Sequence, residues 1–192
     1  MKLQIRNNVF ETNSSSTHSI TVVSFNKDML DIPKSITFEF GEYGWEYEMY
    51  NNTSEKAAYL WTAITTLIEE KTKLEVINKI NYYKSQIITI LNSVGLTDIS
   101  FIEPTINRIG KGDRETWTTY PEDATGYNGG YIDHVRDLQG WPEEMFANPE
   151  LLLSYLFDSC SGIATGCDSG EQELESIPND GRKLAIDFVK GN

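Results

Sequence analysis

The feature that most constrains the fold is a change in hydrophobic period near residue 53. Before it, the segments SITVVSF, SITFEF and GEYGWEYEMY are short and rich in β-branched and aromatic residues, which is typical of strands. After it, apolar residues recur every three or four positions over 53–70, and a capping box at Thr72 and Glu75 begins a second such stretch that ends at Gly95. The sequence therefore predicts an N-terminal β region, opened by a strand in KLQIR, and then two helices that form a hairpin or one kinked rod.

The second half of the chain has weaker signals but contains both kinds of element. DISFI and GYIDHV are expected strands, and Asn148 followed by Pro149 is a helix start that opens PELLLSYLFD. SCSGIATGCDSG is typical of a small-residue turn or a short strand. Residues 173–189 are typical of a β-hairpin, and a C-terminal helix is the alternative for that segment. This order lacks repeated βαβ units and an interdomain linker. It predicts a single α+β domain over 1–192, with N-terminal antiparallel strands, a central helical hairpin and a C-terminal mixed α/β region.

Charge narrows the choice of partner. The chain has 16 Lys and Arg against 29 Asp and Glu, a net charge of −13, and residues 111–192 contain 16 of the acids against 6 of the bases. Nucleic acid and anionic membranes would repel such a chain, whereas a basic protein would attract it. No apolar run is long enough to span a bilayer and no signal peptide is evident, so we expect a cytoplasmic protein.

Two stretches of the sequence contain acidic residues but no basic residues. Residues 35–55 contain no Lys or Arg, and neither do residues 137–181, which hold ten acids. Trp141 and Tyr155 are candidate residues for anchoring a protein partner at an interface. For Tyr155, burial in the core is the stronger interpretation. The residues predicted to bind a basic partner are Glu42, Trp45, Glu46, Glu48, Glu143, Glu144, Glu171, Glu173 and Glu175.

The chain contains only two cysteines and two histidines: Cys160, Cys167, His18 and His134. Together they are the Cys₂His₂ set of a closed tetrahedral zinc site, and the glycines between the cysteines would let a loop turn both sulfur atoms inward. The spacing of the cysteines is longer than in a usual zinc knuckle, so spacing alone favours buried thiols. The hydroxyl run 14–17 before His18 is expected to be a loop, either a slack connector or a stiff turn that orients the imidazole ring.

The segment RNNVFETNSSSTHSI resembles the N-terminus of small phage- and prophage-encoded proteins that share an R-x-x-x-F-E-T-N-S-S-S-T-H-S motif. With YIDH around His134 and LLSYLF before Cys160, the chain is similar to zinc-containing type II-A anti-CRISPR proteins. The resemblance implies a bound zinc ion, the cytoplasm of an infected bacterial host, and the RNA-guided nuclease of a type II CRISPR system as the partner. It does not fix the ligand set, in which Asp168 or Asp133 could replace a histidine.

The predicted function is therefore a stoichiometric inhibitor that blocks DNA loading or cleavage, and not an enzyme. The main alternative is a nucleotide-dependent transferase, because Arg6, the hydroxyl run and Glu171 with Glu173 resemble the motif pieces of ADP-ribosyltransferases. Too few residues separate Arg6 from the serines to build a cofactor cleft. Another zinc enzyme is the second alternative, although the chain has no His-Glu-x-x-His motif and no deaminase Cys-x-x-Cys motif.

Overall fold

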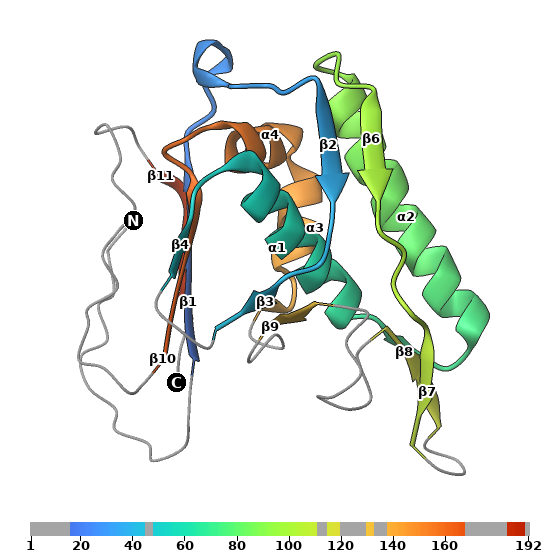
Figure 1. Ribbon diagram of the computed structural model, residues 1–192. Helices are drawn as coiled ribbons and strands as arrows, with labels where there is room; N and C mark the ends of the chain where they lie inside the picture. Colours follow the sequence, from blue (N-terminus) through green and yellow to red (C-terminus); the bar gives the residue numbers. More distant parts are fainter. Residues whose placement is uncertain are drawn as a thin grey trace.

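A buried helix is the central element of the fold. The computed structural model describes residues 16–44, 48–110, 115–119, 130–132, 138–167 and 184–190, with the backbone alone at 16, 17, 167 and 184–190. In this part of the chain, α1 (Thr53–Thr66) lies between a four-stranded sheet and a second unit formed by α2 and the β2–β6 pair (Figure 1). Ten of the 14 residues of α1 are buried, so it is enclosed on more than the single apolar face that the sequence predicts.

Threonine side chains make the burial of α1 possible. The Oγ1 atoms of Thr62, Thr65 and Thr66 donate hydrogen bonds to the carbonyl oxygens of Ala58 (2.8 Å), Trp61 (2.8 Å) and Thr62 (2.7 Å), respectively. Each hydroxyl is thereby satisfied by the preceding turn of its own helix. A helix with polar residues on several sides can therefore lie in the core without unpaired hydroxyl groups.

Four strands from distant parts of the chain form the main sheet. Its order is β11-β1-β10-β4, and all three strand pairs are antiparallel. The strand expected at SITVVSF is confirmed, but it begins three residues earlier, inside the hydroxyl run, so the second half of that run is strand and not loop. The strand at the C-terminus excludes the terminal helix. The strands are β1 (Ser16–Val23), β4 (Glu48–Tyr50), β10 (Gly162–Cys167) and β11 (Leu184–Lys190).

Smaller strand pairs surround the helices. Two of them are parallel (β2–β6 and β3–β9), and β5, β8 and β7 form a three-stranded antiparallel sheet. The expected strands at SITFEF and DISFI are confirmed in shortened form, and GYIDHV is a strand at Tyr131–Ile132, with its residues from 133 on lying outside the described residues. The elements are η1 (Lys27–Met29), β2 (Ser35–Phe38), β3 (Glu42–Tyr43), β5 (Glu69–Glu70), β6 (Asp98–Phe101), β7 (Asn107–Ile109), β8 (Thr116–Thr118) and β9 (Tyr131–Ile132).

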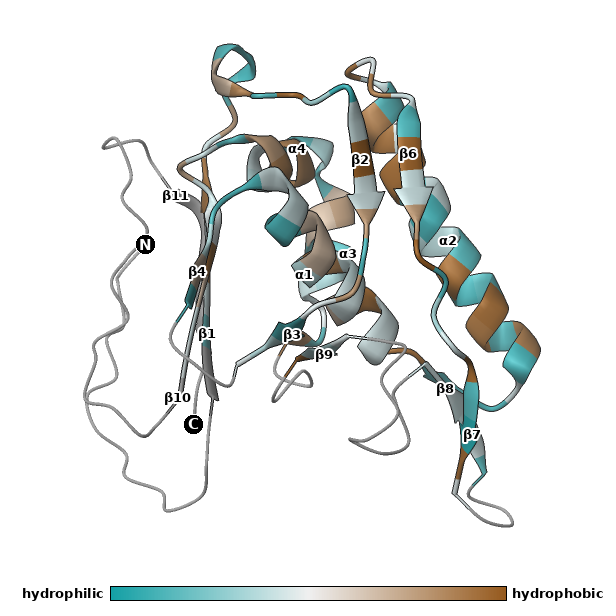
Figure 2. Ribbon diagram, viewed as in Figure 1, coloured by the Kyte–Doolittle hydropathy of each residue, from teal (hydrophilic) through white to brown (hydrophobic). Residues whose placement is uncertain are grey.

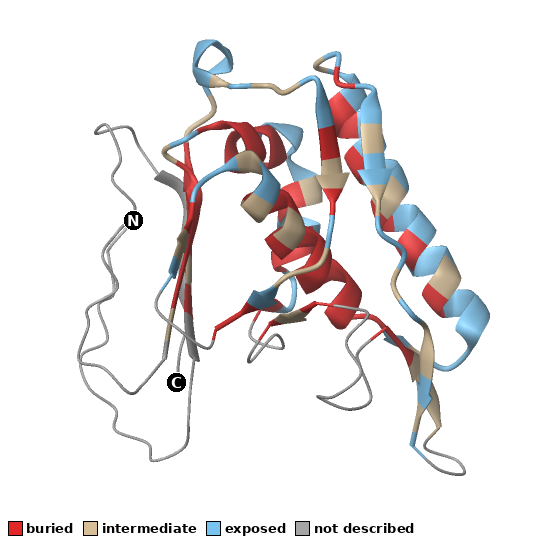
Figure 3. Ribbon diagram, viewed as in Figure 1, coloured by how far each residue is buried: buried red, intermediate tan, exposed pale blue. Residues whose placement is uncertain are grey.

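The other helices begin at the signals found in the sequence, with one exception. α2 (Lys73–Asn92) starts at the predicted capping box, and α4 (Pro149–Phe157) starts at Asn148, whose Oδ1 accepts a hydrogen bond from the Glu150 N–H. α1 and α2 are separate helices joined through β5, and α3 (Trp141–Ala147) was not predicted. α2 alternates hydrophobic and hydrophilic residues along its length (Figure 2), and its buried residues face α1 while its outer side is exposed (Figure 3).

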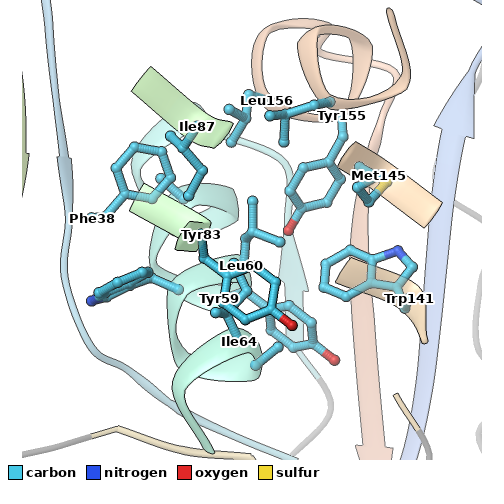
Figure 4. Packing of buried hydrophobic residues seen from close by; sticks show 14 of the residues in the cluster. Phe38, Tyr59, Leu60, Ile64, Tyr83, Ile87, Trp141, Met145, Tyr155 and Leu156 are labelled. Atoms are coloured by element: carbon cyan, nitrogen blue, oxygen red, sulfur yellow. The ribbon is translucent and has the colours of Figure 1, made fainter. Parts of the chain in front are cut away.

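The core forms where α1 meets the other helices and the main sheet. Figure 4 shows Tyr59, Leu60 and Ile64 of α1 between Ile87 of α2 and Trp141 of α3. These elements bury a continuous set of apolar side chains, as an α+β fold requires. The α+β class predicted from the sequence is confirmed. None of the described helices combines the length and the apolar character that a membrane span needs.

Candidate functional site

His18 lies on the inner face of the main sheet, where this face changes from apolar to polar. Its side chain is 1% exposed, and Ile20, two residues further along β1, is completely buried on the same face. The neighbouring position on β10 is Thr165, which is also buried and pairs with His18 in the register. The alternation of β1 therefore turns the histidine into the protein, away from solvent.

The ring of His18 contacts the central helix. Its Nδ1 lies 2.9 Å from the hydroxyl of Tyr59 on α1, with the direction of the hydrogen bond set by the imidazole tautomer. Burial raises the pKa of Tyr59 well above its ordinary value, so the phenol stays neutral. A histidine that binds a metal usually forms a hydrogen bond through its other ring nitrogen, and Tyr59 is placed to be that partner if His18 is a ligand. The side chains of the hydroxyl run 14–17 lie outside the described residues, so its proposed role in orienting the ring stays a prediction, and Tyr59 lies 41 positions away in the sequence.

The two cysteines lie at opposite ends of β10. Cys160 precedes the strand, and its backbone N–H donates to Oδ1 of Asp158 at 2.9 Å, whereas Cys167 is the last residue of the strand and pairs with Ser16. An extended strand rises roughly 3.3 Å per residue, so the Cα atoms of residues 162 and 167 are about 17 Å apart. The structure therefore does not bring the cysteines together, and one zinc ion could be bound by only one of them.

The remaining members of the predicted zinc site lie outside the described residues. These are His134 and the possible substitutes Asp133 and Asp168, together with the side chain of Cys167. Within the described part of the chain, no group of three or more His, Cys, Asp or Glu side chains is placed to hold a metal ion. Zinc binding thus stays a prediction. By register, positions 16, 18, 165 and 167 belong to one end and one face of the sheet, where a ligand set that includes His18 would have to form.

Buried aromatic residues cover the sheet around His18. Tyr59 contacts Trp141 and Tyr43 edge to face, with ring centroids 5.9 Å and 4.9 Å apart, and Trp141 contacts Tyr155 in the same way at 5.5 Å. Tyr155 is fully buried, which confirms the stronger interpretation that it belongs to the core, and Trp141, at 2% exposure, is also a core residue and not an exposed anchor. Their large rings stabilise the core through burial and edge-to-face packing. Nε1 of Trp141 is the single buried side-chain nitrogen or oxygen without a hydrogen-bond partner among the described residues.

Four of the nine predicted partner-binding residues are described, and all four are exposed. Glu42 is on β3, Glu48 on β4, and Glu143 and Glu144 are in the first turn of α3. Glu48 accepts a hydrogen bond from the hydroxyl of Tyr50. The other five residues, Trp45, Glu46, Glu171, Glu173 and Glu175, lie outside the described residues, as does Arg6 of the transferase alternative.

Charged residues are distributed unevenly over the described elements. β3, β4, α1, α3 and α4 carry exposed or half-buried carboxylates, and the single Lys or Arg on them is the buried Lys56. Three cations on α2 and β7 pair with neighbouring acids, whereas Lys73 of α2 lies over the ring of Trp117, 5.9 Å from its centroid. These ion pairs are Lys79–Glu70, Lys84–Glu103 and Arg108–Glu115. Figure 1 places α2, β6 and β7 on one side of α1, and the main sheet with β4 on the other.

Lys56 is a buried cation that sequence reasoning missed. Its Nζ donates hydrogen bonds to the carbonyl oxygens of Asp158 (2.8 Å) and Ser161 (3.1 Å), just beyond the C-terminus of α4. α4 has no basic residue in its last turn, so this ammonium group supplies the positive charge that a helix C-terminus favours. Burial lowers the pKa of Lys56 to about 8, although the nearby Asp158 and Cys160 favour its charged form.

His18 and Tyr59 form a buried pair, and Glu48 of β4 pairs in the register with Thr165, the neighbour of His18 on β10. No family model, no curated protein and no solved structure matches this chain.

Proposed function

We propose that this protein is a stoichiometric, non-catalytic inhibitor that binds the RNA-guided nuclease of a type II CRISPR system and blocks DNA loading or cleavage. The observation that supports this proposal is the separation of charge among the described residues. Exposed acids on β3, β4 and α3 share these elements with no Lys or Arg, whereas three cations on α2 and β7 are paired with acids. β3, β4 and α3 therefore carry negative charge that no Lys or Arg on the same elements compensates.

Such a surface suits a partner that grips nucleic acid. An effector of this type holds its guide and target through their phosphates and therefore exposes a positively charged channel. Carboxylates on a rigid fold can occupy part of that channel, and long-range attraction between a chain of net charge −13 and a basic protein would speed their association. Binding alone would then exclude the target DNA, so no catalytic group is required.

We also propose that zinc has a structural role in this protein. The resemblance of the N-terminal motif supports a bound ion, and the pairing of His18 with Tyr59 is compatible with a ligand whose second nitrogen is held by the protein. A structural zinc ion near this end of the sheet would stabilise the fold on the side that carries β4. Its chemistry would be to link side chains and not to activate water.

The test is a titration of the purified nuclease, loaded with its guide, with this protein before and after addition of target DNA. The proposal expects cleavage to fall linearly until one equivalent has been added, and association to weaken steeply between roughly 50 and 200 mM salt. An enzyme that modifies the nuclease would instead inactivate it progressively at substoichiometric amounts. Failure to associate at low salt, or inactivation by a small fraction of an equivalent, would remove the proposal.

A further inference from the structure

A small cleft opens between the C-terminal end of α1, the middle of α2 and the start of α3. Its volume is about 110 Å³, which corresponds to the liquid volume of roughly four water molecules. Apolar groups of Ile64, Leu67, Ile68 and Pro142 form part of its lining. Ile64 and Ile68 belong to the core, so this part of the cleft is held in place by the packing of α1.

The polar side of the cleft carries a carboxylate in a fixed position. Oε1 of Glu143 accepts a hydrogen bond of 2.6 Å from the hydroxyl of Tyr83, and Tyr83 is 9% exposed. Burial, followed by this hydrogen bond, raises the pKa of Tyr83, so the phenol remains a donor. The bond orients Glu143 from the first turn of α3 toward α2. It thereby places a negative charge beside the apolar lining.

The cation in the lining is already paired. Nζ of Lys79 forms an ion pair with Glu70 of β5, so its charge is compensated. Glu143 has no ion pair with a Lys or Arg among the described residues, and its neighbour Glu144 adds a second exposed carboxylate. The net charge of the side chains at the cleft is therefore negative.

We infer that this cleft receives the side chain of a lysine or arginine from a basic protein partner. An apolar side chain would desolvate Glu143 without pairing it, and an anion would be repelled by it. A long cationic side chain meets both requirements, because its alkyl stem packs against apolar groups while its charged end reaches a carboxylate at the rim. The identity of the basic partner rests on the proposed function. The inference adds one specific contact to the interface between this protein and the nuclease.

The inference can be tested on the protein alone by NMR titration. The probe is acetyl-arginine methylamide, and the matched neutral probe is acetyl-citrulline methylamide, which has nearly the same shape without the charge. We expect the arginine probe to shift the amide signals of Leu67, Ile68 and Gly140 with millimolar affinity, and the citrulline probe to bind at least tenfold more weakly. A tenfold difference corresponds to about 1.4 kcal/mol.

Two variants of the same helical turn provide the control. Glu143→Gln removes the charge but keeps an oxygen that can accept the hydrogen bond from Tyr83, so the fold is retained. Glu144→Gln removes a charge of the same sign next to the cleft but outside its lining. We expect a loss of roughly tenfold in affinity for the arginine probe in Glu143→Gln and a loss of less than twofold in Glu144→Gln.

Equal effects of the two probes, or equal losses in the two variants, would overturn the inference. The same variants separate it from the proposed function. A nuclease that still binds Glu143→Gln with unchanged affinity contradicts the role of the cleft and leaves the inhibitor proposal intact. A cleft that prefers arginine, in a protein that does not bind the nuclease, removes only the inhibitor proposal.

Discussion

The Nδ1 atom of His18 on β1 and the hydroxyl of Tyr59 on α1 lie 2.9 Å apart in a buried hydrogen bond that joins the main sheet to the central helix. Both residues are almost completely buried, at 1% and 0% exposure. A polar pair in such surroundings is costly to break, because a buried polar atom that loses a hydrogen bond is not compensated by bulk water. This contact is therefore a structural link between the strand that carries the N-terminal motif and the core.

The first prediction concerns this link. Tyr59→Phe keeps the ring and its edge-to-face contacts but removes the hydroxyl, and we expect the free energy of unfolding to fall by about 1–3 kcal/mol. Chemical denaturation followed by circular dichroism measures the change. Tyr82→Phe is the control, because Tyr82 is 54% exposed and its hydroxyl should contribute less than about 0.5 kcal/mol. A Tyr59→Phe protein as stable as the parent would contradict a structural role for the pair.

The second prediction follows from the lowered pKa of Lys56. Its pKa is about 8 in the folded protein against 10.5 for an ordinary lysine, so between these values the unfolded chain binds more protons. Stability must then rise with pH over this window, by about 2 kcal/mol between pH 7 and 10. Urea denaturation at each pH measures the rise. Lys56→Met should flatten the profile, whereas Lys34→Met, at an exposed position, should keep it; an unaltered slope in Lys56→Met would contradict the assignment.

The third prediction concerns more alkaline solutions. Burial raises the pKa values of Tyr59 and Tyr155 well above the ordinary value of 10.0, so above pH 10 the unfolded chain loses these protons first. Their stabilising contribution is complete below pH 10 and is lost as the pH rises further. We therefore expect a stability maximum near pH 10, with ionisation of the buried tyrosines, followed by absorbance near 295 nm, occurring only together with unfolding. Ionisation of all ten tyrosines before unfolding would be inconsistent with this burial.

Local signals in the sequence were sufficient for much of the secondary structure. The capping box at Thr72 depends on residues three positions apart, and it forms as predicted, with the Glu75 N–H bonded to Thr72 Oγ1 at 3.2 Å. The Asn148 cap is equally local. α3 escaped prediction because it is only seven residues long and its N-cap is Gly140, which has no side chain to cap the helix and adopts a φ of +89°.

Contacts between segments that are distant in the sequence could not be predicted from local sequence signals. Cys160 and Cys167 bracket small residues that suit either a turn or a strand, and only the pairing of β10 with β1 and β4 selects the strand and separates the thiols. Burial of Trp141 likewise depends on the approach of α1 and α4. Lys56 gives no signal in the sequence, because its acceptors are backbone carbonyl groups more than 100 residues away.

The fourth prediction concerns the approach of two glycines. A Cβ atom at Gly130 would lie 2.3 Å from the carbonyl oxygen of Gly41 and 2.8 Å from Oγ1 of Thr62, and the backbone cannot move aside without separating β3 from β9. We expect Gly130→Ala to lower the free energy of unfolding by about 1–3 kcal/mol. Gly95→Asn is the matched control, since nothing lies within 4 Å of that position and asparagine tolerates its positive φ. Equal stability of Gly130→Ala and the parent would show that this approach is not tight.

The last prediction concerns the metal and follows from the length of β10. Cys167 pairs with Ser16, two residues from His18 along β1, whereas Cys160 lies at the far end of the strand beside Asp158. If about one zinc ion per chain is found, we expect Cys167→Ser to lose it and to lower the melting temperature, and Cys160→Ser to keep it, because ligands of one ion must lie within a few ångströms of each other. Elemental analysis and thermal denaturation, each with and without a chelator, measure both effects. Loss of the ion in both variants would mean that the two thiols meet, which the extended strand does not permit, and retention in both would exclude cysteine ligation.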